Sequence, residues 1–236
     1  MQNELRKSYD SEKWTLLSPV HASSVGCLLC PSNEEKTEET GRIEEEIGKI
    51  KNWVCRSIVD PYPFTHPMIF KAKEDGHLKS FLAHGWTEVI SETRDHTKEL
   101  HDLSANDIKN ILLLYKERIS SLRKRENVEV IGIIKDNLRI EFDHSYSKMF
   151  TLPIIPTKIK ERITSFNDFL YKQGSCIYCD LIKKEQGSPR VILDNDNAFC
   201  IVTYSQELPY EVLIIPKKHA PCLMDLSDME LFNLAE

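Results

Sequence analysis

Residues 88–104 read EVISETRDHTKELHDLS, and residues 211–227 repeat the pattern as EVLIIPKKHAPCLMDLS. In both copies a Glu-Val pair opens a strand-like run, a histidine follows eight residues after the glutamate, and Asp-Leu-Ser closes the stretch. A Cys-x-x-Cys pair precedes each copy, at residues 27–30 and at residues 176–179. Because the same residue types recur in the same order, we interpret the chain as one duplicated ancestral unit, with a metal-type ligand set in each copy.

Length and composition narrow the class of protein. A chain of 236 residues is long enough for one large domain or two smaller ones, and 41% hydrophobic with 29% charged residues is ordinary for a soluble globular protein. The formal charge of −6 gives no electrostatic footprint for nucleic acid or for an anionic membrane. The start, MQNELRKSYD, lacks the apolar run of a signal peptide, and no stretch is apolar for the length of a membrane span. We therefore expect a cytoplasmic protein that binds neither nucleic acid nor membrane.

The pattern of strands and helices predicts an α+β fold, an antiparallel sheet with helices packed on it, in two histidine-triad-like units. The strand candidates are residues 14–19, 51–59, 68–72, 87–92, 128–134, 190–193, 198–203 and 211–215, and residues 136–156 are also strand-like. Ser104 with Asp107 and Ser227 with Glu230 are capping boxes, and each predicts the start of a helix. The acid-rich segment Glu34–Glu46 is predicted to be an exposed loop or a solvated helix face.

Three segments follow from this pattern. We expect an N-terminal unit over residues 1–157, a linking helix over residues 158–175, and a C-terminal unit over residues 176–236. The chain stops nine residues after Ser227 (236 − 227), so the second unit is expected to be incomplete.

Cysteine and histidine spacing suggests zinc, which takes four Cys or His ligands in a tetrahedron at a structural site. There are seven cysteines, and in a chain without an export signal the two Cys-x-x-Cys pairs favour metal over disulfides. Cys27, Cys30 and His96 form the first predicted set, with His144 as the best candidate for a fourth ligand. A redox pair or unpaired thiols is the alternative.

The second predicted set, Cys176, Cys179 and His219, has no visible fourth ligand. Water or a carboxylate completes it, or it holds no metal. The remaining cysteines, Cys55, Cys200 and Cys222, are predicted to be buried or free thiols.

These residues resemble the galactose-1-phosphate uridylyltransferase family, a two-unit branch of the histidine-triad superfamily. The resemblance covers most of the chain, through WTLLSP at Trp14, CLLCPSNEEKT at Cys27, ETRDHTKELHDLS at Glu92 and RVILDNDNAFCIVTYSQELPYEVLIIPKKH at Arg190. It implies a protein that moves a nucleoside monophosphate from a nucleotide sugar to a hexose 1-phosphate through a nucleotidyl-histidine. It also implies zinc at Cys27, Cys30, His96 and His144, and a homodimer.

The chain departs from the family pattern at the reacting group. Where the family has His-Pro-His-x-Gln, the sequence reads His144-Ser-Tyr-Ser-Lys, which puts Tyr146 at the nucleophile position and Lys148 at the glutamine position. A phenol with a pKa near ~10 is mostly neutral at pH 7 and forms a far more stable phosphate ester than imidazole does. We expect Tyr146 to be a packing residue beside a structural metal, and Lys148 to be a solvated surface lysine.

The expected phosphate-binding positions differ as well. The glycine-rich loop of the family is replaced by Asp136–Asp143, which contains no glycine, and a family asparagine falls at about Asp60. If a substrate binds, Asp60, Asn137 and Lys148 are the expected contacts. The sequence therefore supports two hypotheses: a uridylyltransferase-like protein with an altered catalytic motif, or a non-catalytic, zinc-stabilised module that binds a nucleotide, a sugar phosphate or a protein partner.

Overall fold

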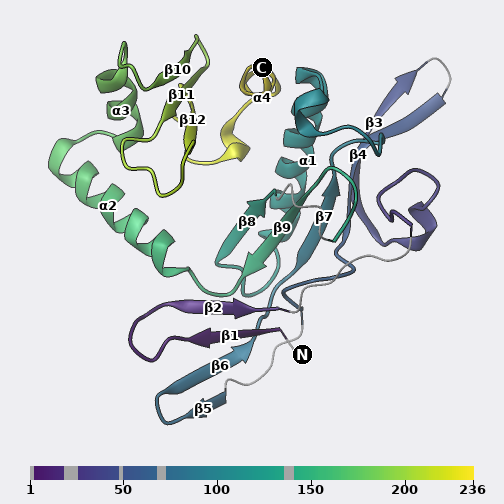
Figure 1. The fold of residues 1–236 in the computed structure, drawn as a ribbon, viewed down its shortest axis with the longest axis horizontal. Coiled ribbons are helices and arrows are strands. Elements are labelled where there is room, and N and C mark those ends of the chain that lie inside the picture. The colour runs from purple at the N-terminus through teal and green to yellow at the C-terminus, as the bar shows by residue number, and fades with distance from the viewer. Residues whose placement is uncertain (1–2, 19–25, 48–49, 68–72, 136–140) are drawn as a thin grey trace. The chain divides into compact units, whose positions relative to one another are not determined.

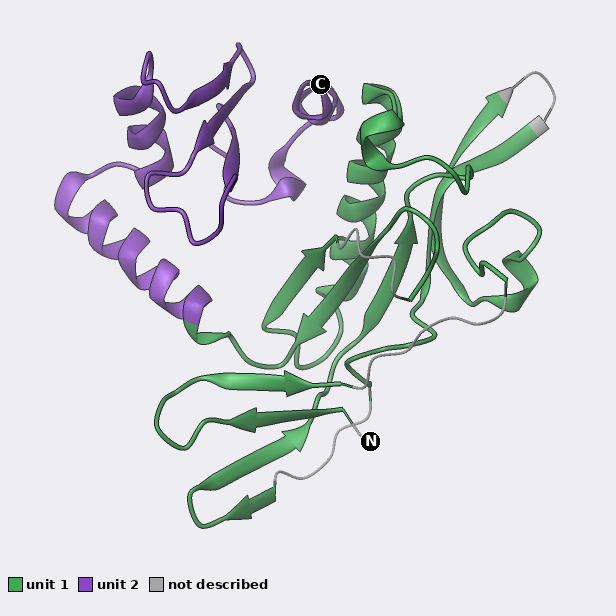
Figure 2. Cartoon of the chain, viewed as in Figure 1, with its two compact units in different colours: residues 1–157 green, residues 158–236 purple. Residues whose placement is uncertain are grey.

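A computed structural model describes residues 3–18, 26–47, 50–67, 73–135 and 141–236. The chain forms two compact units, Met1–Thr157 and Lys158–Glu236 (Figure 2). Antiparallel sheets and α-helices make up the chain, so the predicted α+β class is confirmed. No helix within the described ranges is both long enough and apolar enough to cross a membrane.

The first unit is built on a five-stranded antiparallel sheet in the order β3-β4-β7-β9-β8 (Figure 1). The strands are β3 (Glu39–Ile47), β4 (Ile50–Val59), β7 (Thr87–Ser91), β8 (Val130–Ile134) and β9 (Tyr146–Leu152). Successive side chains along β4, β7 and β9 point to opposite faces of the sheet, and the five residues of β7 are all buried.

Helix α1 (Ala105–Leu122) covers one of these faces. Its start is a capping box, in which Ser104 Oγ accepts from the Asp107 backbone N–H at 3.2 Å and Asp107 accepts from the Ser104 N–H at 3.0 Å. The apolar side of the helix packs on the sheet in a core of Cys55, Ile90, Ile111, Leu114, Leu122 and Met149. The opposite face carries a second core of Leu29, Ile58, Val89, Phe142 and Tyr146. Both faces of the sheet are therefore buried, each by different residues.

A separate four-stranded sheet in the order β2-β1-β6-β5 lies within the first unit. Its strands are β1 (Glu4–Lys7), β2 (Trp14–Leu17), β5 (Lys73–Asp75) and β6 (Leu78–Leu82). Of these strands only β2 was predicted; β1 and β5 consist mostly of charged residues. The predicted strand at residues 68–72 lies outside the described residues.

The prediction for Glu34–Glu46 was wrong. Apart from a short 3-10 turn at Glu34–Lys36, most of this segment belongs to β3, a nine-residue edge strand paired with β4. Its charges are compatible with an edge, where Glu44 pairs with Lys51 at 2.6 Å and Arg42 with Glu39 at 2.6 Å. Charge density alone therefore did not distinguish a solvated loop from a charged edge strand.

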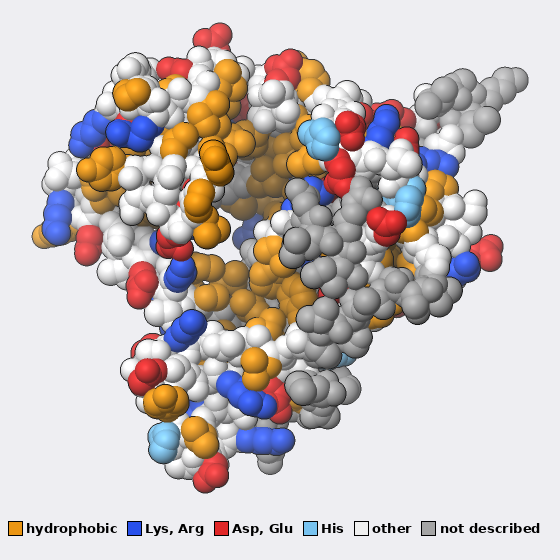
Figure 3. Space-filling view, viewed as in Figure 1, with side chains coloured by type: hydrophobic (Ala, Val, Ile, Leu, Met, Phe, Trp, Pro, Cys, Tyr) orange, Lys and Arg blue, Asp and Glu red, His pale blue; other side chains and the backbone are white. Residues whose placement is uncertain are grey.

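The second unit contains a smaller antiparallel sheet and three helices. The elements are α2 (Thr157–Gln173, which begins at the last residue of the first unit), α3 (Ile177–Glu185), β10 (Val191–Asp194), β11 (Ala198–Val202), β12 (Val212–Pro216) and α4 (Asp228–Ala235). Phe199, Ile201 and Ile215 pack against Tyr178, Leu181 and Ile182 of α3. The side chains at alternate positions of these strands are exposed, including Ile192, Val212 and Ile214. Figure 3 shows hydrophobic side chains gathered over this three-stranded sheet.

The two sequence copies fold into the same series of elements. Each runs from a strand (β7 or β12) through a histidine-bearing loop to a 3-10 turn, Leu100–Asp102 or Leu223–Asp225. Each then reaches a serine with a complete capping box, Ser104 or Ser227, at the start of a helix. The repeat in the sequence is thus a repeat of local structure.

Candidate metal centre and the altered nucleophile position

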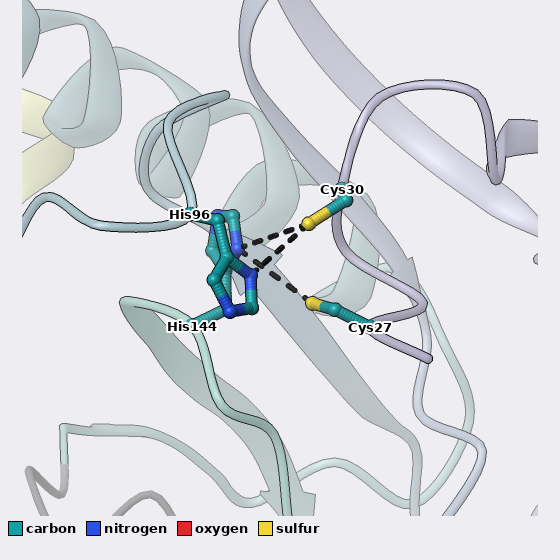
Figure 4. A group of neighbouring side chains, drawn as sticks. All are labelled: Cys27, Cys30, His96 and His144. Carbon is teal, nitrogen blue, oxygen red and sulfur yellow. Dashed lines mark hydrogen bonds between the residues drawn. The ribbon is translucent and has the colours of Figure 1, made fainter. Parts of the chain in front are cut away.

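Four side chains from three separate parts of the first unit meet at one point. Cys27 and Cys30 lie on a tight turn, His96 follows β7, and His144 precedes β9. Their ligand atoms all lie within 4.8 Å of one another, and Figure 4 shows the side chains directed toward a common centre. The structure thus brings together all the residues of the first predicted ligand set.

The spacing of these atoms fits a tetrahedral metal. Cys30 Sγ lies 3.1 Å from His96 Nδ1 and 3.8 Å from His144 Nδ1, and Cys27 Sγ lies 3.6 Å from His144 Nδ1. A tetrahedron with metal–ligand bonds of ~2.0–2.3 Å has edges of roughly 3.3–3.8 Å. The group could therefore hold a metal ion with little movement, and its two sulfur and two nitrogen donors are those that zinc takes at closed sites.

Backbone and carboxylate groups orient both histidines. His144 Nε2 lies 2.8 Å from the Thr93 carbonyl oxygen, so this nitrogen carries the proton and Nδ1 is left to face the cysteines. His96 Nε2 lies 3.5 Å from a carboxylate oxygen of Asp143. Such partners on the far ring nitrogen are the usual way in which a protein sets the tautomer of a metal-ligating histidine.

The pKa values of the Cys27 and Cys30 thiols are shifted in opposite directions. Burial opposes ionisation of Cys27, but its hydrogen bonds to His144 and to the Leu29 backbone outweigh this effect and lower its pKa to about 6. Burial and the neighbouring Cys27 raise the pKa of Cys30 to about 11. The pair therefore favours one negative charge without metal, and a cation that binds both thiolates must displace the second proton.

Arg56 hydrogen-bonds to the turn that carries Cys27 and Cys30. This role of Arg56 was not predicted from the sequence. Its side chain is fully buried and donates to the Leu28 carbonyl oxygen at 2.8 Å and to Thr37 Oγ1 at 3.1 Å. Leu29 is also fully buried, in the core on this face of the sheet. The period-two pattern Arg56, Ile58, Asp60 on β4 and just after it would have placed all three side chains on one face.

Replacing Arg56 is expected to weaken metal binding. Arg56→Met leaves the Leu28 carbonyl without its donor and loosens the turn between Cys27 and Cys30, so metal affinity should fall roughly 10–100-fold, as for other outer-shell partners. Competition with a chromophoric chelator measures the affinity. Arg94→Met is the matched control, because Arg94 also stacks on the Trp53 ring, at 5.1 Å against 5.2 Å for Arg56, and donates to the Trp53 carbonyl. If Arg56→Met binds the metal as tightly as Arg94→Met and the natural chain do, the turn does not depend on Arg56.

The residues of the second predicted set also lie close together, but this set has fewer members and is more exposed than the first. Cys176, Cys179 and His219 have ligand atoms within 4.8 Å of one another, and Cys179 Sγ lies 3.3 Å from His219 Nδ1. Among the described residues the group has three members, and His219 is exposed. A pocket of about 450 Å³ adjoins it, lined by Phe166, Tyr178, Ile182, Pro216, Lys218 and Pro221 together with the three ligands and neighbouring residues. In the described residues this set could supply three ligands to an ion, whereas the first set could supply four.

Tyr146, which the family resemblance would place at the nucleophile position, is packed in the core. Its exposed fraction is 6%, and its ring meets Phe142 edge-on at 5.2 Å in the core with Val89 and Ile58. A group that attacks phosphorus must reach it in line, and here the neighbouring aromatic ring and aliphatic side chains enclose the tyrosine.

Lys148 is not a surface lysine, so that expectation was wrong. It is 5% exposed, and its ammonium lies 2.9 Å from Asp60 Oδ2, contacts the Glu141 carboxylate and lies 5.3 Å from the centre of the Phe64 ring. The strand register explains the burial, because Ile58, Val89 and Lys148 are cross-strand neighbours on the face of the sheet opposite α1. Two predicted substrate contacts, Asp60 and Lys148, thus bind each other. The third, Asn137, lies outside the described residues.

No protein-family model matches the chain. Among curated proteins, the ADP-glucose phosphorylase of Arabidopsis thaliana is 25% identical over 98% of this chain and 70% of its own length. A galactose-1-phosphate uridylyltransferase of Thermotoga maritima is 24% identical over 99% of this chain and 72% of its own length.

Solved structures agree with the sequence comparison. A uridylyltransferase structure matches 98% of this chain and 72% of that chain with a TM-score of 0.82 and 26% identity. The crystal structure of the Arabidopsis thaliana ADP-glucose phosphorylase with bound ADP-glucose matches in fold, with a TM-score of 0.74 and 23% identity. The resemblance to galactose-1-phosphate uridylyltransferases that the sequence motifs indicated is confirmed.

Proposed function

We propose that this chain is a zinc-stabilised protein of the uridylyltransferase fold that binds a nucleotide sugar or a sugar phosphate without forming a nucleotidyl-enzyme. The ligand class is supported by the names of the relatives, which include a galactose-1-phosphate uridylyltransferase and an ADP-glucose phosphorylase. A cytoplasmic homodimer that does not bind nucleic acid or membranes is part of the proposal, on the family resemblance and the net charge of −6.

The observation that carries this proposal is the environment of Tyr146 and Lys148. Transfer through a covalent intermediate needs a nucleophile that can reach phosphorus and cationic donors for the charge that develops there. Tyr146 is enclosed by Phe142, Val89 and Ile58, and the ammonium of Lys148 already binds two carboxylates. Neither group is free for that task in this arrangement.

Zinc is proposed as the metal of the first set. Two thiolates and two imidazoles from Cys27, Cys30, His96 and His144 fill a tetrahedral shell, and a filled shell gives the ion a structural role. It would tie the cysteine turn to β7 and to the start of β9. Zinc at Cys176, Cys179 and His219 would keep one position for water or another ligand.

Nucleotidyl transfer to a hexose 1-phosphate is the second candidate, and the similarity over 98% of the chain to an ADP-glucose phosphorylase favours it. In that case the Tyr146 oxygen would bond to the α-phosphorus, the sugar phosphate would leave, and the tyrosyl proton would pass to a base. The second sugar phosphate would then displace the tyrosine.

Intact-mass spectrometry separates the two candidates. After incubation with UDP-glucose or ADP-glucose we expect no covalent adduct, and at most a trace with Tyr146→His, because an imidazole alone does not free Lys148. Tyr146→Phe is the matched control, since it keeps the ring and removes the oxygen. A stoichiometric gain of one nucleoside monophosphate on the natural chain that is lost in Tyr146→Phe would establish transfer and refute the non-covalent proposal.

A further inference from the structure

Three groups surround the ammonium of Lys148. Asp60 Oδ2 lies 2.9 Å away, the Glu141 carboxylate is in contact, and the Tyr62 carbonyl oxygen lies at 3.5 Å. A lysine ammonium has three N–H donors, so these acceptors use its full capacity. Two carboxylates against one ammonium leave the cluster with a net charge of −1 by formal count.

The two carboxylates are held differently. Asp60 is 2% exposed, and its second oxygen accepts from the Tyr62 backbone N–H at 2.9 Å, so it is anchored at the end of β4. The Glu141 side chain is 20% exposed, against 0% for Asp60 and 6% for Lys148. Glu141 is therefore the partner with access to solvent, and the one that a ligand could replace.

From this geometry we infer that the Glu141 carboxylate occupies the place of a ligand's phosphoryl oxygens beside Lys148 and competes with them. A phosphoryl group and a carboxylate offer the same kind of acceptor to an ammonium, and only one of them fits in the third position next to Asp60 and Tyr62. The ligand class rests on the proposed function. The competition itself rests on the contacts of Lys148.

The cluster also explains why two departures from the family pattern occur together. An aspartate at residue 60 alone would place an uncompensated buried carboxylate on this face, and a lysine at residue 148 alone would bury an unpaired ammonium. Together they neutralise each other, and Glu141 adds the charge that an incoming anion must displace. A site of this kind binds phosphate weakly until Glu141 moves away.

Glu141→Gln tests the inference, with inorganic pyrophosphate and UDP-glucose as probes in isothermal titration calorimetry. The variant keeps the size of the side chain and the Asp60–Lys148 pair, so it should bind pyrophosphate more tightly than the natural chain, on the order of tenfold, because a negative charge has been removed beside the anion. The matched control is Glu44→Gln, which breaks an ion pair with Lys51 on another part of the same sheet and should change nothing.

A double variant shows whether the gain passes through the lysine. Glu141→Gln with Lys148→Gln should lose the added affinity, while the glutamine amide still donates to Asp60 and limits destabilisation. Thermal melts confirm that each variant is folded. Unchanged pyrophosphate affinity in Glu141→Gln, or a gain that survives the loss of Lys148, would overturn the inference.

The two probes separate this inference from the proposed function. If the natural chain binds UDP-glucose and Glu141→Gln binds neither probe more tightly, the competition is refuted and the proposed function stands. If Glu141→Gln gains pyrophosphate binding and no variant binds a nucleotide sugar or a sugar phosphate, the competition stands and the proposed ligand class is refuted.

Discussion

Removing the metal from the first set is expected to unfold the first unit. A structural zinc site contributes about 10 kcal/mol of folding free energy in small domains, which is comparable to the ~5–15 kcal/mol total stability of a typical protein. The ligands come from the cysteine turn, the loop after β7 and the residue before β9, so the ion would join segments that are distant in the sequence. Without it, only weak thiol–imidazole hydrogen bonds would link the two half-buried cysteines to the two histidines.

Cys30→Ser is the sharpest variant for this test, because it removes one thiolate and keeps the size of the side chain. Elemental analysis should show about one zinc lost per chain, and the cooperative melting transition should move far downward or vanish, as it should after chelation. The control is Cys222→Ser, since Cys222 is exposed and belongs to neither set. Zinc near zero in the natural chain, with melting unchanged by chelator, would contradict the prediction. Cys179→Ser, measured in the same way, reports whether the second set holds metal.

The second large loss of stability is expected when the buried ion pair between Arg118 of α1 and Glu88 of β7 is broken. Arg118 Nε and Nη2 each donate to the Glu88 carboxylate at 2.8 Å, and Nη1 donates to the Thr40 carbonyl oxygen at 2.6 Å. The exposed fractions of the two side chains are 9% and 6%. Arg118→Met would leave the Glu88 charge buried without its partner, so the free energy of unfolding should fall by about 3–5 kcal/mol.

Tryptophan fluorescence during urea unfolding measures this loss in the first unit alone, because Trp14, Trp53 and Trp86 all lie within Met1–Thr157. The double variant Arg118→Met with Glu88→Gln should recover much of the loss, since no buried charge then remains unpaired. Glu117→Gln is the control, because Glu117 also pairs with Arg118, at 3.8 Å, but its side chain is 51% exposed, so loss of this pair should cost little. A double variant as unstable as the sum of the single variants would show that the two residues do not act as a pair.

Periodicity and local chemistry predicted the elements that depend on nearby residues. The capping boxes at Ser104 and Ser227 were found because the residues that make them are three positions apart, and the helices begin there. The repeat indicated that Cys27, Cys30 and His96 would group together. His144 was the best candidate for a fourth ligand, and the family resemblance also implied it. In these cases the sequence itself contains the geometric relation.

The errors concern partners that are distant along the chain. Lys148 was expected on the surface because a lysine considered alone favours water, whereas its burial depends on Asp60 across the sheet. Similarly, the charges of β3 suggested solvent exposure, and the long pairing with β4 that makes it a strand is a tertiary relation. Arg56 was overlooked for the same reason, because its partner is the carbonyl group of Leu28 on the cysteine turn.

The alternation of side chains along β9 has an evolutionary consequence. Ser147 and Met149 face α1, where Ser147 lies 2.6 Å from the Tyr115 hydroxyl and Met149 belongs to the core. Tyr146 and Lys148 face the other way, toward Phe142 and Asp60. Alternate residues of this strand therefore support the helix, and the residues between them face the opposite side of the sheet. A lineage could exchange the residues at positions 146 and 148 while the residues that hold the helix stayed the same, so the fold could persist through changes on the other face of the sheet.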